Sequence, residues 1–166
     1  MDAIGVRGGF NSDIVRIPPS EKEDFEHYDI FAQLGLPGGF TSESGWQFGY
    51  RLTGSAGVMH GAGDTGFIST LTPGFFLRQP SWRFTVDAGV GPSYVSTEKY
   101  GSQDLGGPIQ IAAHFGITLD VTERIGLGWR FHHISDAGIW GSDNRGVDVN
   151  LFELSYKFDS FPLYRY

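Results

Sequence analysis

The chain has 166 residues, of which 25 are glycine, 15% are aromatic and 19% are charged, and its net charge is -7. The negative charge argues against a nucleic-acid partner, because phosphate binding needs a basic patch. The absence of cysteine excludes a disulfide framework, a thiolate metal site and a cysteine nucleophile. No stretch approaches the roughly 18 consecutive apolar residues of a transmembrane helix. The length suits a single domain over residues 1–166.

Alternation of apolar and polar residues with period two recurs along the chain, and long runs of helical period are nearly absent. No signal peptide precedes the first run, so we expect either a cytosolic protein or a mature form with an added start methionine. The alternation predicts eight strands, at residues 2–10, 25–36, 46–58, 65–78, 82–96, 108–120, 125–135 and 147–158. Residues 37–39 are expected to open a turn. The fold predicted is all-β, an eight-stranded antiparallel up-and-down transmembrane barrel.

The side chains on the two faces of the strands indicate which face is inside. One face carries Gly, Ser, Thr and Gln with a few charges of both signs, which suits the narrow lumen of an eight-stranded barrel: Arg51, Asp87, Arg130 and Glu153. The other face is large and aromatic, which suits contact with lipid. Three tryptophans are expected to be girdle residues near strand ends or one turn in: Trp46, Trp82 and Trp129. We therefore expect a multi-pass barrel in the outer membrane of a Gram-negative bacterium.

Two residues at the end of the seventh run, His133 and Ser135, are candidates for chemistry. They are two positions apart in a strand, so they point to the same side as the apolar residues of that run. Their place beside a long loop puts them at the boundary of water and lipid. His132 points the opposite way, into the lumen with His114, where an internal polar network is the expected role.

Asp148, near the start of the eighth run, shares the outward face of that strand. His133, Ser135 and Asp148 are therefore a candidate hydrolytic triad, with Ser135 as nucleophile, His133 as base and Asp148 as the acid that fixes the imidazole tautomer. The adjacent turn at Asp136, Ala137 and Gly138 is the candidate oxyanion site, because its backbone N–H groups could receive the charge. From these residues alone, polar side chains at a strand exit without a catalytic role are the favoured interpretation.

The stretch His133-Ile134-Ser135-Asp136-Ala137-Gly138, followed by Asn144-Arg145-Gly146-Val147-Asp148, resembles the outer-membrane lipid A 3-O-deacylases. That family has His-x-Ser-Asn-Ala-Gly at the end of the seventh strand and a glutamate at the start of the eighth. The resemblance extends to residues 86–91 and 103–106. It implies hydrolysis of the ester-linked 3-hydroxyacyl chain at position 3 of lipid A, with lipopolysaccharide as substrate, outer-membrane lipid as surroundings and no metal or other cofactor.

Two positions depart from the family pattern. Asp136 stands where the family has asparagine, and an ionised carboxylate repels an oxyanion that an amide would stabilise. Backbone N–H groups would then have to stabilise the oxyanion, or Asp136 would need to be protonated. Asp148 is one methylene shorter than the family's glutamate. A weakened enzyme and an altered substrate preference both stay open.

The acyl chain of the substrate would lie on apolar residues near the triad. The candidates for this groove are Trp129, Ile139, Trp140 and Phe152. Two alternatives to the esterase are a non-enzymatic outer-membrane barrel, adhesin-like or structural, and a soluble carrier of a hydrophobic ligand. A homodimer is considered, although the sequence does not give the oligomeric state.

Overall fold

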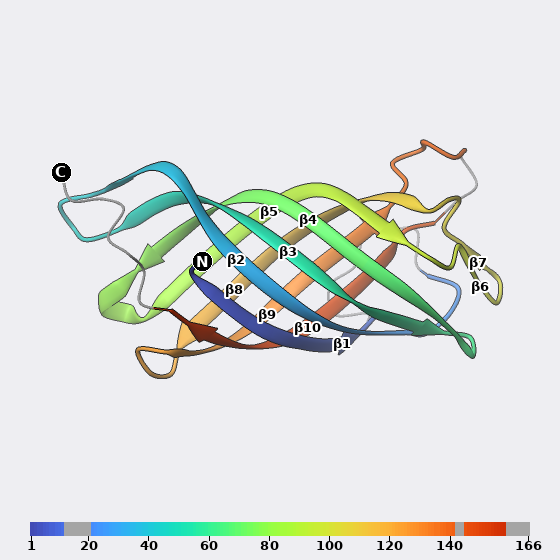
Figure 1. The fold of residues 1–166 in the computed structure, drawn as a ribbon, viewed down its shortest axis with the longest axis horizontal. Helices are drawn as coiled ribbons and strands as arrows, with labels where there is room; N and C mark the ends of the chain where they lie inside the picture. The colour runs from blue at the N-terminus through green and yellow to red at the C-terminus, as the bar shows by residue number, and fades with distance from the viewer. Residues whose placement is uncertain (12–20, 142–144, 159–166) are drawn as a thin grey trace.

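The computed structural model describes residues 1–11, 21–141 and 145–158. Within them, eight long strands close into one antiparallel barrel, with β1 hydrogen-bonded to both β2 and β10 (Figure 1). These strands are β1 (Ala3–Phe10), β2 (Phe25–Thr41), β3 (Gln47–Gly61), β4 (Asp64–Gln79), β5 (Phe84–Val95), β8 (Ile109–Asp120), β9 (Ile125–Ser135) and β10 (Val147–Lys157). The predicted eight-stranded antiparallel barrel is confirmed.

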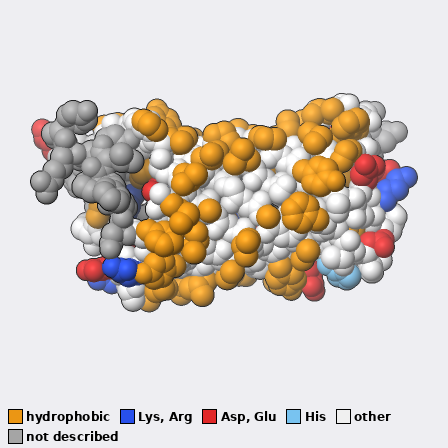
Figure 2. All heavy atoms as spheres, in the orientation of Figure 1, with side chains coloured by type: hydrophobic (Ala, Val, Ile, Leu, Met, Phe, Trp, Pro, Cys, Tyr) orange, Lys and Arg blue, Asp and Glu red, His pale blue; other side chains and the backbone are white. Residues whose placement is uncertain are grey.

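The outer wall of the barrel is apolar. Neighbouring residues on β2 illustrate the alternation, since Ile30 is 65% exposed whereas Phe31 is 4% exposed. Hydrophobic side chains spread along the visible wall, and charged side chains gather at its two ends (Figure 2). Tilted strands of about ten residues span the hydrocarbon core of a bilayer, and closure pairs their backbone groups. Among the residues described, no helix has the length and apolar character needed to cross a membrane.

The lumen is filled by buried ion pairs. Arg130 is fully buried and donates to Asp87 at 2.6 Å and to Glu153 at 3.1 Å. Arg7 forms two hydrogen bonds of 2.7 Å with Asp29. Such pairing offsets the cost of removing charges from water. The predicted inward orientation of the charged residues is correct, and a lumen packed this way argues against the soluble carrier of a hydrophobic ligand.

The end of the barrel beside the β9–β10 connection is closed by an apolar cluster. A hairpin of two short strands, β6 (Lys99–Tyr100) and β7 (Gln103–Asp104), lies in the connection from β5 to β8 (Figure 1). Tyr100 from this hairpin and Leu105 just after it are both almost fully buried. They join lumen-facing residues at the strand ends: Phe25, Met59, Ile68, Val95, Ala112, Ile134 and Val147.

The turn expected at residues 37–39 was wrong. Strand β2 runs on through Thr41, and its register against β3 shifts between Leu36 and Gly39, which marks a bulge. Gly38 and Gly39 have φ values of 103° and 130°, a region that disfavours residues with a Cβ, so these glycines form a bulge within the strand. The β2–β3 turn comes later, where Ser42 N donates to Trp46 O at 2.8 Å.

The tryptophans do not all lie near strand ends. Trp82 belongs to a short 3-10 helix, Pro80–Trp82, so the fifth strand begins later than expected. It packs edge-on against Trp46 at 5.5 Å, at the end of the barrel that has the short turns. Trp129 instead lies in the middle of β9, opposite Phe152 of β10. The positions of Trp46 and Trp82 fit the girdle prediction, whereas Trp129 lies further along its strand and its girdle role stays a prediction.

Candidate active site

Strand β9 places His133 and Ser135 on the outer wall at the end of the barrel that the apolar cluster closes. The intervening Ile134 is fully buried in that cluster, which fixes the face on which its two neighbours lie. The His133 side chain keeps 23% of its surface exposed. Both residues are therefore held by a rigid strand and are accessible from the lipid side.

The third member of the candidate triad comes from the neighbouring strand. Asp148 of β10 lies directly opposite His133 of β9 in the antiparallel register. His133 Nδ1 donates to Asp148 Oδ1 at 2.5 Å, and Ser135 Oγ donates to His133 Nε2 at 3.0 Å. A carboxylate only accepts hydrogen bonds, so Nδ1 carries the proton and Nε2 is left to accept from the serine. The structure thus brings all three predicted residues together in the order that nucleophilic catalysis requires.

Asp148 is 2% exposed, although it points outward. The pairing of β1 with β10 ends at Phe10 opposite Asn150, before the strand reaches Asp148. The backbone N–H of Asp148 donates instead to Glu21 Oε1 at 2.6 Å. A carboxylate from the β1–β2 connection thus serves as its backbone acceptor at this level. The sequence reasoning did not identify Glu21, because a loop glutamate carries no local signal of this contact.

The carboxylate of Asp136 organises the turn that follows Ser135. One oxygen accepts the Gly138 N–H and the other accepts the Trp140 N–H, both at 3.0 Å. The Asp136 carboxylate therefore acts as an acceptor and the Gly138 N–H is already used, while the oxyanion role expected for the backbone N–H groups of this turn stays a prediction. In the part of the chain that the structure describes, no hydrogen bond occupies the Ala137 N–H. Ala137 has a φ of 50°.

The four residues predicted to line the acyl groove lie in two places, the turn after β9 and the outer wall of the barrel. Trp140 donates its indole N–H to Ile109 O at 2.8 Å, which places it beside the start of β8, and Ile139 is 56% exposed. Trp129 and Phe152 pair across β9 and β10. Trp129 is four residues from His133, about 13 Å along the strand.

Two outward residues of β8 that lie close to the triad were not identified from the sequence. Ala113 lies opposite His133 and Ile111 lies opposite Ser135, both on β8. Phe131 lies between His133 and Trp129 on the outward face of β9 and completes the apolar path. Only the strand register reveals the two β8 neighbours, whereas the place of Phe131 follows from the period-two alternation of β9 itself.

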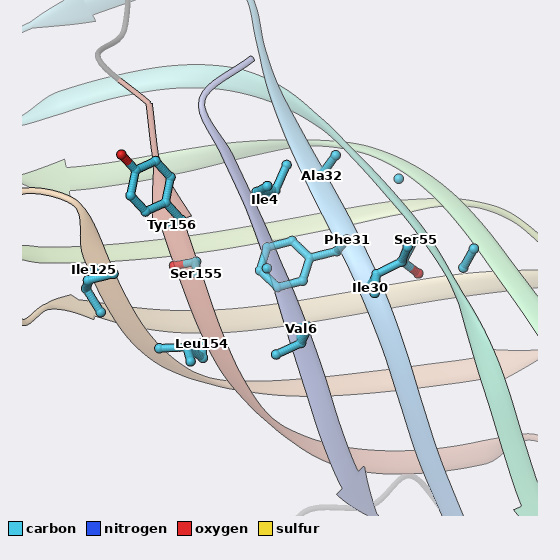
Figure 3. A pocket seen from close by; sticks show the side chains of 13 residues that line it. Ile4, Val6, Ile30, Phe31, Ala32, Ser55, Ile125, Leu154, Ser155 and Tyr156 are labelled. Atoms are coloured by element: carbon cyan, nitrogen blue, oxygen red, sulfur yellow. The ribbon is translucent and has the colours of Figure 1, made fainter.

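An apolar groove lies elsewhere on the molecule. It has a volume of about 770 Å³ and lies on the outer wall across β10, β1, β2 and β3 (Figure 3). Ile4, Val6 and Ile30 stand around it. Its nearest outward residue on β10, Leu154, is six residues from Asp148, about 20 Å along the strand. The groove is therefore separate from the triad.

The lumen histidines do not form a metal site. Across the described ranges, no group of three or more histidine, aspartate or glutamate side chains has a suitable arrangement. His132 stacks on His27 with ring centroids 6.0 Å apart, and stacked rings do not direct their nitrogens to one point. His114 lies beside them and contacts Asp87 at 3.6 Å. His114 and His132 both face the lumen as expected, but among the described residues only His114 has a polar partner there, so the polar network expected for both histidines stays a prediction.

The fold and the site define a class of protein, a closed barrel with an apolar outer wall that carries a Ser-His-Asp arrangement on that wall. Residues 26–157, well over half of the chain, match the lipid A 3-O-deacylase (PagL) family. The chain belongs to this family, as the motif around His133 and Ser135 indicated.

Two known proteins are similar to the chain. The lipid A deacylase PagL of Bordetella bronchiseptica is 30% identical over 76 residues, which cover 46% of this chain and 42% of that protein. The matched segment thus spans less than half of this relative. The crystal structure of the outer membrane enzyme PagL matches with a TM-score of 0.75 and 16% identity, covering 93% of this chain and 98% of that chain. At this identity the likeness shows the fold.

Proposed function

We propose that the protein is a lipid A 3-O-deacylase in the outer membrane of a Gram-negative bacterium. It hydrolyses the ester that joins a 3-hydroxyacyl chain to position 3 of lipid A. The observation that carries the proposal is His133, hydrogen-bonded to both Asp148 and Ser135 on an apolar outer wall. Lipid contacts this outer wall, so an ester at the surface of the lipid layer can reach Ser135. Family membership supports lipid A as the molecule that carries this ester.

The reaction follows from the hydrogen bonds of the triad. Ser135 Oγ attacks the acyl carbonyl carbon, and His133 Nε2 takes the hydroxyl proton. Asp148 holds the other ring nitrogen and stabilises the imidazolium. The tetrahedral intermediate expels the 3-hydroxyl oxygen of lipid A, which receives the proton from His133. Water, deprotonated by His133, then cleaves the acyl-serine ester and releases a 3-hydroxy fatty acid.

The oxyanion of the tetrahedral intermediate needs a donor beside Ser135. We assign this role to the Ala137 N–H, because the carboxylate of Asp136 accepts from Gly138 and Trp140 and so shapes the turn. With this arrangement Asp136 works as an ionised carboxylate, without the amide that the family has at this position. A backbone donor costs no reorganisation when charge develops.

The orientation of the barrel supports the choice of substrate. The connections at the triad end include the longest ones, whereas residues 42–46, 80–83 and 121–124 form short turns at the other end (Figure 1). In outer-membrane barrels the short turns face the periplasm and the longer loops face outward. Ser135 then lies at the outer leaflet, where lipopolysaccharide is. The acyl chain would run over Phe131 toward Trp129 and Phe152.

Mass spectrometry of lipopolysaccharide incubated with the refolded protein tests the proposal. We expect lipid A to lose one 3-hydroxyacyl chain, and Ser135→Ala to abolish the loss. Ser69→Ala is a matched control, because Ser69 also lies on the outer wall, on β4 opposite Tyr94. Loss of the chain with Ser135→Ala, or no loss with the parent protein, would contradict the proposal. A homodimer stays a prediction, which analytical ultracentrifugation in detergent would test.

A further inference from the structure

The hairpin formed by β6 and β7 is anchored to the end of the barrel that carries the triad. Tyr100 is fully buried, stacks edge-on against Phe25 at 5.3 Å and donates its hydroxyl to Met59 O at 3.4 Å. Leu105 is 1% exposed within the same apolar cluster. These contacts fix the hairpin against the strand ends, so groups on it can hold other segments in place.

Gln103 of this hairpin joins three segments that are far apart in the sequence. Its side chain is almost fully buried, and Nε2 donates to Arg145 O and to Gly146 O, each at 3.1 Å. Oε1 accepts the backbone N–H of Lys22 at 2.8 Å. The hairpin backbone adds a contact, since Asp104 O accepts the Arg145 N–H at 3.1 Å. The amide of Gln103 thus ties the β1–β2 connection to the start of β10.

The segment that Gln103 holds lies directly against the triad. A Cβ on Gly146 would be 2.9 Å from His133 Cε1 and 3.0 Å from Ser135 Cβ, so the backbone of Gly146 packs against both residues. Asp148 follows two residues later. Its own N–H is held by Glu21, the residue before the one whose N–H Gln103 accepts. Gln103 and Glu21 therefore hold the same segment together, the residues that lead into β10 and begin it.

We propose that Gln103 and Glu21 are positioning residues for Asp148, holding the start of β10 so that the aspartate meets His133. This inference rests on the proposed function. Neither residue lies on the path assigned to the substrate. Catalysis depends steeply on such placement, since a displacement of about 1 Å can reduce a rate by about a hundredfold. Supporting residues of this kind keep a reactive group in its productive geometry.

Substitution of Gln103 separates positioning from general stability of the loop. Gln103→Leu removes all three hydrogen bonds at similar volume, and we expect kcat to fall by about 10- to 100-fold with little change in KM. Gln110→Leu is the matched control. Gln110 is equally buried and donates to Leu105 O and Gly107 O of the same connection, but to no residue of β10. Its loss should leave kcat near that of the parent.

The proton between His133 and Asp148 gives a readout that does not depend on turnover. A proton in a short hydrogen bond resonates far downfield, so proton NMR of the protein in detergent should show the His133 Nδ1 proton. We expect Gln103→Leu and Glu21→Ala to weaken or shift this signal and Gln110→Leu to leave it. The Glu21→Ala variant tests the proposal again if Gln103→Leu does not fold, as judged by heat-dependent gel mobility.

Three results would overturn the inference. The first is that kcat and the NMR signal are unchanged in both Gln103→Leu and Glu21→Ala. The second is that Gln110→Leu lowers kcat as much as Gln103→Leu does, and the third is that the positioning variants raise KM while kcat is preserved. Failure of the proposed function looks different. In that case the parent protein releases no acyl chain from lipopolysaccharide, yet the His133 signal is present and still responds to Gln103→Leu.

Discussion

Two neighbouring histidines of β9 face different environments. His133 points outward, is partly exposed and forms hydrogen bonds through both ring nitrogens, with Asp148 and Ser135. His132 points into the lumen, is 1% exposed, and neither ring nitrogen bonds to any residue in the described ranges. The two side chains have the same chemistry, so the face of the strand decides which one is exposed and bonded to both a serine and an acid.

The lumen and the outer wall also use carboxylates differently. In the lumen, Asp87 is paired with Arg130 and Arg51, so its charge is used to offset buried cations. On the wall, Asp148 pairs with an imidazole, whose charge changes when it takes a proton. The comparison teaches that charge density alone does not mark the reactive site of this barrel. The candidate site is marked instead by an imidazole that bonds to both an acid and a serine hydroxyl on the outer wall, since Asp87 in the lumen also contacts a histidine, His114, at 3.6 Å.

Substitution of each of the two histidines should show the largest difference between the outer wall and the lumen. His133→Ala should lower kcat by about 10⁴- to 10⁶-fold, because it removes the base while the fold is kept. His132→Gln should leave kcat close to the parent value, since the His132 side chain faces the lumen, on the opposite side of β9 from Ser135. Release of 3-hydroxy fatty acid from lipopolysaccharide measures both. Similar losses in the two variants would show that the lumen histidine takes part in the reaction.

Asp148→Asn should give the next largest effect. An amide at this position no longer fixes the tautomer with Nδ1 protonated, and we expect kcat to fall by about 10³- to 10⁴-fold. Asp148→Glu, which restores the family's residue, should retain far more activity. The same acyl-release assay compares them. An asparagine variant as active as the parent would remove Asp148 from the triad.

Arg130→Met tests whether the ion pairs of the lumen serve stability alone. It leaves Asp87 and Glu153 buried without their shared cation, and breaking such a group costs about 3–5 kcal/mol of stability. The urea concentration at the midpoint of unfolding in detergent should fall, while molecules that stay folded keep their activity. An unchanged midpoint, or a specific loss of kcat in folded protein, would contradict a purely structural lumen.

The smallest effect concerns Glu23, outside the membrane-spanning strands. Its carboxylate accepts hydrogen bonds of 2.7 Å from the Oγ and the backbone N–H of Ser102, which lower its pKa below the usual value. A lowered pKa means that this link stabilises the fold fully at neutral pH and is lost as the pH falls through the lowered pKa. Proteolysis of the β6–β7 hairpin should increase at acid pH in the parent. Glu23→Gln should show little of this pH dependence.

Much of the wall could be predicted from the sequence. Period-two alternation gave the eight strands and the outward face of His133, Ser135 and Asp148, because side chains alternate strictly across a strand. The bulge at Gly38 and Gly39 was not predicted, since Pro-Gly-Gly is typical of turns as well. The β6–β7 hairpin was not predicted either, because its two-residue strands are too short to show an alternation of apolar and polar residues.

The roles of single polar residues were harder to predict than the strands. Asp136 was expected near the oxyanion, but its carboxylate accepts two backbone N–H groups of the turn. Gln103 and Glu21 bind the β10 segment across 42 and 127 positions of sequence, respectively. Local patterns carry no information about such contacts, which form only when the closed barrel brings the connections together.

The sequence by itself determined the alternation, the apolar outer face and the motif that links this chain to its family. These features are local, because each depends on a strand's period or on a short spacing. Only the tertiary structure decided that Asp148 lies opposite His133, that Ser135 reaches its second nitrogen and that three connections meet at Gln103. Those contacts depend on the register of β9 with β10 and on closure of the barrel, and hydrogen bonding between distant segments sets both.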